Sequence, residues 1–157
     1  MTLAVFDIDG VVADVRHRLH HLERRPKDWG AFFGAAEADV ALTAGVDLVH
    51  AALANGHEVT WLTGRPSWLR SVTQQWLEDL QLPTGELLMR PHSDFRPART
   101  FKVEALKRLS GRDIVLFVDD DPDVVESARA AGFPAHLATW VPHSKTLARA
   151  QEQDGRT

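Results

Sequence analysis

The stretch LAVFDIDGVVAD, residues 3–14, places two aspartates and a glycine directly after a run of apolar residues. The run Leu3–Phe6 predicts a strand of a parallel sheet, because strands covered on both faces are continuously apolar rather than alternating. Asp7 and Asp9 then lie at the carboxyl end of that strand, which is the edge where open parallel sheets bind ligands. The stretch therefore predicts an α/β domain whose first strand delivers two carboxylates to a ligand site.

The rest of the chain alternates between strand-like and helix-like segments. Further strands are expected at 58–62, 86–89, 113–118 and 135–138, and helices at 45–54, 67–80, 100–109, 122–131 and 144–151. This alternation predicts a three-layer, Rossmann-like fold with a central parallel sheet and right-handed crossovers. Residues 14–43 do not fit the alternation, and we expect them to form a small helical cap over one end of the sheet.

The composition is typical of one globular domain, with 157 residues of which 44% are apolar and 25% charged. The chain has no cysteine, which excludes disulfides and thiolate chemistry. No apolar stretch is long enough to span a bilayer, and the chain begins with a strand rather than a signal peptide. We therefore expect a cytoplasmic protein without membrane contact. The polar residues 151–157 are expected to form a flexible tail.

Basic residues gather in two places, between residues 16 and 27 and between residues 90 and 108, although the net charge is −4. Each group fits a solvated helix face as well as a surface that binds an anion, and the charge pattern leaves both open. His17, His20 and His21 accompany the first group. A second metal site there is the less favoured interpretation, because the aspartates already account for a cation.

Polar side chains follow three of the predicted strands. Asp7 and Asp9 follow the first, Thr63-Gly64-Arg65 follows the second, and Asp119-Asp120 follows the fourth, with Lys102 near the start of the preceding helix. If these strands are neighbours, their side chains converge on one pocket. Carboxylates at that density repel one another unless a cation neutralises them, and oxygen ligands favour a hard ion such as Mg²⁺.

Such a group of side chains suits phosphoryl transfer. An aspartate can attack phosphorus and form an aspartyl-phosphate, and a second carboxylate can act as general acid and base. Thr63, the Gly64 N–H group and Lys102 can bind the phosphoryl oxygens. Each piece alone also has a structural interpretation, because residues 119–121 before Pro122 fit a helix N-cap with acids at the positive end of the helix dipole.

The order of the motifs resembles that of the haloacid dehalogenase superfamily of phosphotransferases over nearly the whole chain. The matching stretches are FDIDGVVAD (6–14), WLTGR (61–65), Lys102 in TFKVEAL (100–106) and LFVDDDPDVV (116–125). The resemblance implies that Asp7 is the nucleophile and Asp9 the acid and base, that Thr63 holds the phosphoryl group, and that Lys102 steadies the nucleophile. It also implies a phosphatase rather than a dehalogenase, because Asp9 is present.

The same resemblance implies the ligands of Mg²⁺, which are the side chains of Asp7, Asp119 and Asp120 and the backbone carbonyl of Asp9. A narrower similarity is to the 3′-phosphatase domain of phage-type polynucleotide kinase, through VRHRLHHL (15–22), KDWGAFF (27–33) and MRPHSDFRPARTFK (89–102). It implies a set of substrate-binding residues, namely Gly64, Arg18, Arg65, Asp94 and Arg96. Ala98 and Asp121 depart from that pattern and leave the substrate open.

The function expected from the sequence is thus a Mg²⁺-dependent phosphomonoesterase acting on 3′-phosphate ends of RNA or DNA, or on nucleotides. A small-metabolite phosphatase is the alternative, and a non-catalytic binding module is a third. The chain has no glycine-rich phosphate loop ending in Lys-Ser or Lys-Thr, so a kinase or ligase partner would be separate. Trp29, Phe32 and Phe33 are expected to pack within the cap rather than to stack on bases.

Overall fold

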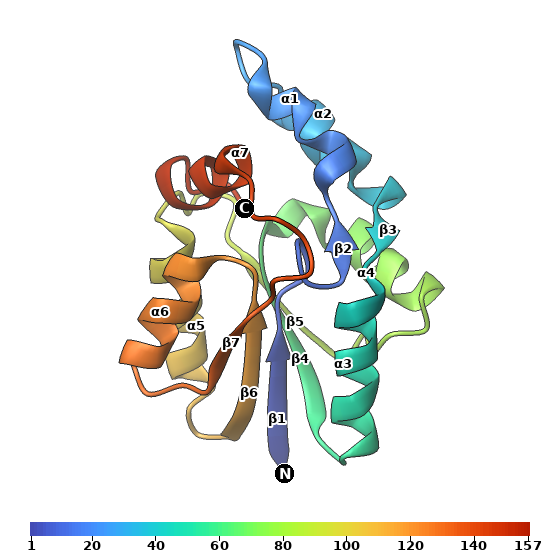
Figure 1. Cartoon of the computed structure of the whole chain (residues 1–157), viewed down its shortest axis with the longest axis vertical. Coiled ribbons are helices and arrows are strands. Elements are labelled where there is room, and N and C mark those ends of the chain that lie inside the picture. Colours follow the sequence, from blue (N-terminus) through green and yellow to red (C-terminus); the bar gives the residue numbers. More distant parts are fainter.

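The computed structural model describes residues 1–157 and has a parallel sheet of five strands in the order β5-β4-β1-β6-β7 (Figure 1). The strands are β1 (Thr2–Phe6), β4 (Glu58–Pro66), β5 (Glu86–Arg90), β6 (Asp113–Asp119) and β7 (Ala135–Leu137). The first strand is central, and Phe6 is level with Trp61 of β4 and Val118 of β6. The residues that follow these three positions therefore lie at the same end of the sheet, as the sequence predicts.

Helices cover both faces of the sheet. On one face lie α3 (Thr43–Ala54) and α4 (Arg70–Asp79), which follows the short 3₁₀ helix η3 (Ser67–Leu69). On the other lie α5 (Ala98–Arg108) and α6 (Pro122–Ala130). Figure 1 shows the two helix pairs on opposite sides of the strands. The expected three-layer fold is confirmed.

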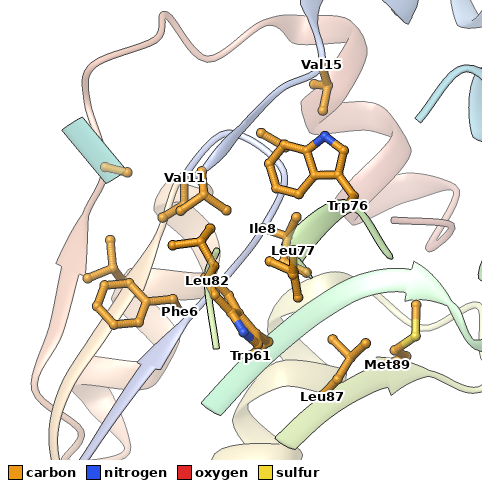
Figure 2. Packing of buried hydrophobic residues seen from close by; sticks show 14 of the residues in the cluster. Phe6, Ile8, Val11, Val15, Trp61, Trp76, Leu77, Leu82, Leu87 and Met89 are labelled. Atoms are coloured by element: carbon orange, nitrogen blue, oxygen red, sulfur yellow. The ribbon is translucent and has the colours of Figure 1, made fainter. Parts of the chain in front are cut away.

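The alternation of side chains along β1 supplies both cores. Ala4 and Phe6 face α3 and α4, whereas Leu3 and Val5 face α5 and α6, and all four are fully buried. On the first face Phe6 lies 6.1 Å from the Trp61 ring between centroids, within the cluster that Figure 2 shows. A strand that is apolar on both faces needs a helix layer on each side, and β1 has α3 and α4 on one face and α5 and α6 on the other.

The cap is small and mostly helical, as expected for residues 14–43. Its elements are η1 (Arg16–Arg18), α1 (His20–Glu23), α2 (Trp29–Gly34) and η2 (Ala35–Ala38). It begins and ends in a short antiparallel ribbon formed by β2 (Ala13–Asp14) and β3 (Val40–Ala41). Phe32 and Phe33 are buried, so these two aromatic residues pack within the cap as predicted. In Figure 1 the cap rises from the end of the sheet opposite the N-terminus.

The last residues differ from the expectation of a frayed tail. After α7 (Lys145–Ala148) and one π-helical turn, η4 (Arg149–Gln153), the last residues reach the end of the sheet, where Thr157 meets Asp9 and Gly64. Thr157 is buried, the Arg156 N–H donates to Ala150 O at 3.0 Å, and Lys27 of the cap pairs with Asp154 at 2.6 Å. These contacts bind the tail to both the cap and the core. None of the helices has the length and apolar character that crossing a membrane requires.

Candidate active site

Three neighbouring strands bring the predicted acids together with Lys102. Asp7 follows β1, Asp119 ends β6, and both carboxylates are buried. The Lys102 ammonium, which α5 projects between them, lies 2.9 Å from Asp7 Oδ2 and 2.6 Å from Asp119 Oδ2. Thr63 is also buried, near the end of the neighbouring β4. The structure thus brings Asp7, Asp119 and Lys102 into contact and places Thr63 on the strand next to β1.

A tight loop follows β1 and carries the second acid, Asp9. The Ile8 carbonyl accepts hydrogen bonds from the N–H groups of Val11, Val12 and Ala13, at 3.1, 2.9 and 2.9 Å. Gly10 has a φ of +78°, and a Cβ there would lie 2.2 Å from Asp120 Oδ2. Only glycine permits both this conformation and this approach. The glycine of the motif therefore lets Asp120 lie against the loop that carries Asp9.

Three carboxylates form a group that suits a metal ion. One oxygen each of Asp7, Asp119 and Asp120 lie within 4.8 Å of one another, and all three residues are buried. Burial raises the pKa of Asp119 to about 7 despite the opposing effect of Lys102, and burial likewise raises the pKa of Asp7. A hard divalent cation bound by these oxygens would offset the repulsion, so the donor set fits the expected metal. The Asp9 carboxylate is not part of this group.

Lys102 is the positive charge within the cluster. It is buried, and burial alone would lower its pKa, but Asp119 and Asp7 outweigh that effect and raise it. The lysine therefore stays protonated and keeps two carboxylates in place. This arrangement accounts for the position of Lys102 on the inner face of α5, whose other buried residues are apolar.

Arg18 and Arg65 surround the Asp9 carboxylate. Arg65 Nη2 and Nε lie 2.7 and 2.9 Å from Asp9 Oδ1, and Arg18 Nη2 lies 3.2 Å from the same oxygen. Both guanidinium groups are fully buried. Burial alone would raise the pKa of Asp9, but the two arginines outweigh it and lower the pKa to about 2. Asp9 is therefore ionised, and both arginines engage its Oδ1 rather than its Oδ2.

Asp39 completes this network and was missed by the sequence analysis. Its Oδ1 accepts from Arg18 Nε at 2.8 Å, and its Oδ2 accepts from Arg65 Nη2 at 3.0 Å. Trp76 of α4 donates to the Asp39 carbonyl at 2.9 Å and fixes the residue at the end of the cap. No motif marks Asp39, although two buried arginines beside a single acid would have indicated that a second anion was needed.

The first histidine of the cap also contacts Asp39. His17 Nε2 lies 2.6 Å from Asp39 Oδ1, whereas His20 and His21 stack on each other at 4.0 Å. Neither group of clustered metal-ligating atoms in the chain includes a histidine. The structure therefore gives the cap histidines contacts with Asp39 and with each other, and places none of them in a group of metal-ligating atoms.

Asp94 and Arg96 lie outside the buried cluster, in the loop before α5. Arg96 Nη2 pairs with Asp94 Oδ2 at 2.7 Å, and Arg96 Nη1 pairs with Glu104 at 2.5 Å. Arg90 lies beneath this loop and is fully buried; it donates to the carbonyls of Arg96 at 2.7 Å and of Gly64 at 3.2 Å. Arg90 thus links the loop that carries the predicted pair with the turn at Gly64.

Residues from the C-terminal part also reach the site, and sequence reasoning missed them. Thr157 Oγ1 lies 3.3 Å from Asp9 Oδ2, and a Cβ at Gly64 would lie 2.2 Å from the Thr157 carbonyl carbon. His143 Nδ1 and Gln151 Nε2 approach Asp120 at 3.5 and 3.4 Å. No local pattern predicts these contacts, because each arises from the chain returning across the sheet edge.

With this sheet order the fold is similar to that of a haloacid dehalogenase-like hydrolase, and the acids lie at the edge where the sequence predicts them. Residues 2–137 match the model of the polynucleotide kinase PNKP phosphatase domain, and the chain belongs to that family. It is therefore a phosphatase domain by family. No sequence among the curated proteins matches the chain.

Three solved structures illustrate the fold. A chain of the Pnkp1/Rnl/Hen1 complex has a TM-score of 0.74 and 22% identity, over 90% of this chain and 47% of that one. A class C acid phosphatase from Bacillus anthracis has a TM-score of 0.63 and 20% identity, over 83% and 59%. A putative haloacid dehalogenase-like hydrolase from Bacteroides fragilis has a TM-score of 0.66 and 12% identity, over 96% and 93%. The present chain thus spans about half the length of the first relative.

Proposed function

We propose that the protein is a Mg²⁺-dependent phosphomonoesterase that acts through an aspartyl-phosphate at Asp7 on 3′-phosphate ends of nucleic acid. The observation that carries the proposal is the contact of Lys102 with both Asp119 and Asp7, which lies two residues before an Asp9 carboxylate that Arg65 holds at 2.9 Å. Mg²⁺ would be held by Asp7, Asp119 and Asp120 with the Asp9 carbonyl, and when bound it would neutralise the phosphoryl oxygens.

In the first half of the proposed reaction, the Asp7 carboxylate attacks phosphorus while the ester P–O bond breaks. The leaving alcohol oxygen takes a proton from Asp9. A bound phosphate dianion offsets the charges of Arg18 and Arg65, which raises the pKa of Asp9 towards the range of a proton donor. Lys102, Thr63 and the Gly64 N–H group bind the remaining oxygens, whose charge is spread in the transition state.

In the second half, Asp9 takes a proton from a water molecule whose oxygen attacks the same phosphorus. The bond to Asp7 breaks, and inorganic phosphate leaves with the carboxylate restored. Because Arg18 and Arg65 engage Asp9 Oδ1, the other oxygen is the one that exchanges protons with the alcohol and the water. The two arginines are thus proposed to position Asp9, which acts as both acid and base. Through Asp9 they also position the leaving group.

The substrate part of the proposal rests on the family and on the cap. The family model is that of the phosphatase domain of polynucleotide kinase PNKP. The cap between β2 and β3 is small, and a small cap suits the end of a long molecule as substrate. A relative of similar fold belongs to a Pnkp1/Rnl/Hen1 RNA repair complex. We propose that this chain likewise works beside a kinase or ligase activity, with Asp94 and Arg96 at the mouth contributing to substrate binding.

Replacing the proposed nucleophile tests the mechanism. Asp7→Asn should abolish hydrolysis of a generic aryl phosphate, because the uncatalysed reaction is extremely slow and the amide does not replace the carboxylate. Steady-state hydrolysis is measured, and circular dichroism verifies the fold. Asp14→Asn, at an exposed ion pair with Arg16, is the control and should retain activity. Turnover by Asp7→Asn near the parent rate would refute the phospho-aspartate.

A substrate panel tests the proposed substrate. The kcat/KM for 3′-phosphorylated RNA and DNA oligonucleotides should exceed that for mononucleotides and sugar phosphates. It should also fall as salt rises, because phosphate contacts release counterions from nucleic acid. The small esters serve as the control, since their kcat/KM should depend little on salt. A preference for sugar phosphates or mononucleotides would instead assign the protein to small metabolites.

A further inference from the structure

Four aromatic side chains form a slot beside the site. Trp29 and Phe33 come from α2, Trp68 from η3, and Phe95 from the loop before α5; the cavity between them has a volume of about 100 Å³. Trp68 and Phe95 are 60% and 52% exposed, although large apolar side chains are more stable when covered. We call these four residues the aromatic slot.

The side chain of Arg156 occupies the slot. Its guanidinium carbon lies 5.2 Å from the centroid of the Trp29 ring and 4.8 Å from that of the Phe95 ring. No carboxylate lies within ion-pair distance of Arg156, so contact with ring faces rather than a salt bridge holds it there. A flat, delocalised group between two aromatic rings occupies the space that a nucleobase would need for stacking.

The next residue connects the slot with the reaction centre. Thr157 follows Arg156 directly, and its Oγ1 lies 3.3 Å from Asp9 Oδ2 while its carbonyl accepts from Arg90 Nη2 at 3.4 Å. The phosphate-binding turn at Gly64 lies against the Thr157 carbonyl group. The pair Arg156-Thr157 therefore places a planar group against the rings of the slot and oxygen atoms beside Asp9 and Gly64, where the proposed reaction would hold the 3′-phosphate of a nucleotide.

We propose that the aromatic slot binds the base of the nucleotide that carries the scissile phosphate, and that Arg156-Thr157 occupies both positions until substrate displaces it. The inference rests on the proposed function and adds the substrate's terminal base to it. The slot lies at the mouth of the site, where Asp94 and Arg90 also contribute to its lining. A base held there limits how far the attached phosphate can move from Asp7.

The test measures binding separately from hydrolysis. In the Asp7→Asn protein, fluorescence anisotropy gives the Kd of a 3′-phosphorylated oligonucleotide that ends either in a base or in an abasic residue. Adding Trp68→Ala should weaken binding of the base-bearing end by about 5- to 100-fold, the range of one stacking contact. Binding of the abasic end should stay unchanged. Leu53→Ala, at a 41% exposed leucine of α3, is the control and should change neither.

The outcomes separate the two proposals. The proposal that the slot binds a base would be overturned if Asp7→Asn bound the two ends with equal affinity. It would also be overturned if Trp68→Ala weakened the binding of both ends equally. A different result is that the unsubstituted protein hydrolyses neither end while Asp7→Asn still binds the base-bearing end more tightly. That result would refute the proposed substrate and leave the slot supported. Hydrolysis of both ends without a base preference would support the phosphatase and overturn the slot.

Arg156→Ala tests the displacement. Removing the stacked guanidinium should tighten binding of the base-bearing end by about two- to fivefold, because the base no longer competes with a cation–π contact. Arg149→Ala removes the same charge from an exposed position outside the slot and should affect the two ends equally. Weaker binding of the base-bearing end in Arg156→Ala would show that Arg156 belongs to the binding site and would overturn its displacement.

Discussion

At the scale of single residues, the site depends on how buried charges are paired. Asp9 alone would face two guanidinium groups, and Asp39 supplies the second anion that balances them. Removing one member of a buried group of charges is costly, because the partner keeps its desolvation penalty without compensation. Asp39 therefore contributes both to the stability of the cap and to the position of Asp9.

We expect Asp39→Asn to destabilise the protein by about 3 kcal/mol and to lower kcat, because Arg18 and Arg65 lose an anion and hold Asp9 less firmly. Urea denaturation gives the stability, and aryl phosphate hydrolysis gives kcat. Asp14→Asn, which removes an exposed ion pair with Arg16, should change stability by less than about 1 kcal/mol. Equal effects of the two substitutions would contradict the role of Asp39.

At the scale of elements, the loop after β1 decides whether the acids meet. Its three hydrogen bonds to the Ile8 carbonyl make the turn, and Gly10 allows Asp120 to approach from the neighbouring strand. The Trp140 indole N–H donates to the Val11 carbonyl at 3.0 Å and thereby ties the loop to a distant part of the chain. The motif glycine is therefore needed for the contact between two elements as well as for the local turn.

Two glycines with the same backbone conformation separate these effects. Gly10 and Gly56 have φ values of +78° and +80°, but a Cβ at Gly56 would meet no atom within 4 Å. Both alanine variants should lose about 1–2 kcal/mol of stability from the left-handed conformation. Only Gly10→Ala should also lose Mg²⁺-dependent activity, because its Cβ displaces Asp120. Urea denaturation and Mg²⁺ titration of kcat measure the two effects, and unchanged Mg²⁺ dependence in Gly10→Ala would contradict this account.

At the scale of the whole molecule, the fold gathers negative charge that it does not neutralise by itself. Three buried carboxylates lie together at the sheet edge and the Lys102 ammonium contacts two of them, whereas most other charges of the chain are at the surface. The cap, the sheet and the returning C-terminal segment all meet at this edge (Figure 1). A cation bound there would stabilise the folded state as a whole.

Mg²⁺ should therefore raise the melting temperature. At a concentration of about 100 times Kd, binding adds about 2.7 kcal/mol, which corresponds to about 5–10 °C in a domain of this size. Asp120→Asn should reduce this shift and raise the melting temperature without metal, since one source of repulsion is gone. Asp47→Asn, at an exposed position on α3, is the control for charge alone. A Mg²⁺ shift that is the same in Asp120→Asn would contradict the proposed ligand set.

The sequence alone determined the sheet and the acids at its edge. Apolar runs such as Leu3–Phe6 and the polar residues after them are local patterns, and parallel strands necessarily bring their carboxyl ends to one edge. The proposed Asp7, Thr63, Lys102 and Asp119 could be found in this way. The packing of residues 151–157 could not be predicted in this way. Their composition shows that they are polar, but it does not show which surface of the fold they contact.

Only the tertiary structure decided which partners the remaining residues have. The ion pairs of Asp39 with Arg18 and Arg65 join residues 21 and 26 positions apart, and the contact of Thr157 with Asp9 joins residues 148 apart. The aromatic slot likewise combines α2, η3 and a distant loop. Local hydrogen bonding and side-chain periodicity act over a few residues, whereas these contacts form only when buried charges and apolar rings from separate elements are brought together by packing.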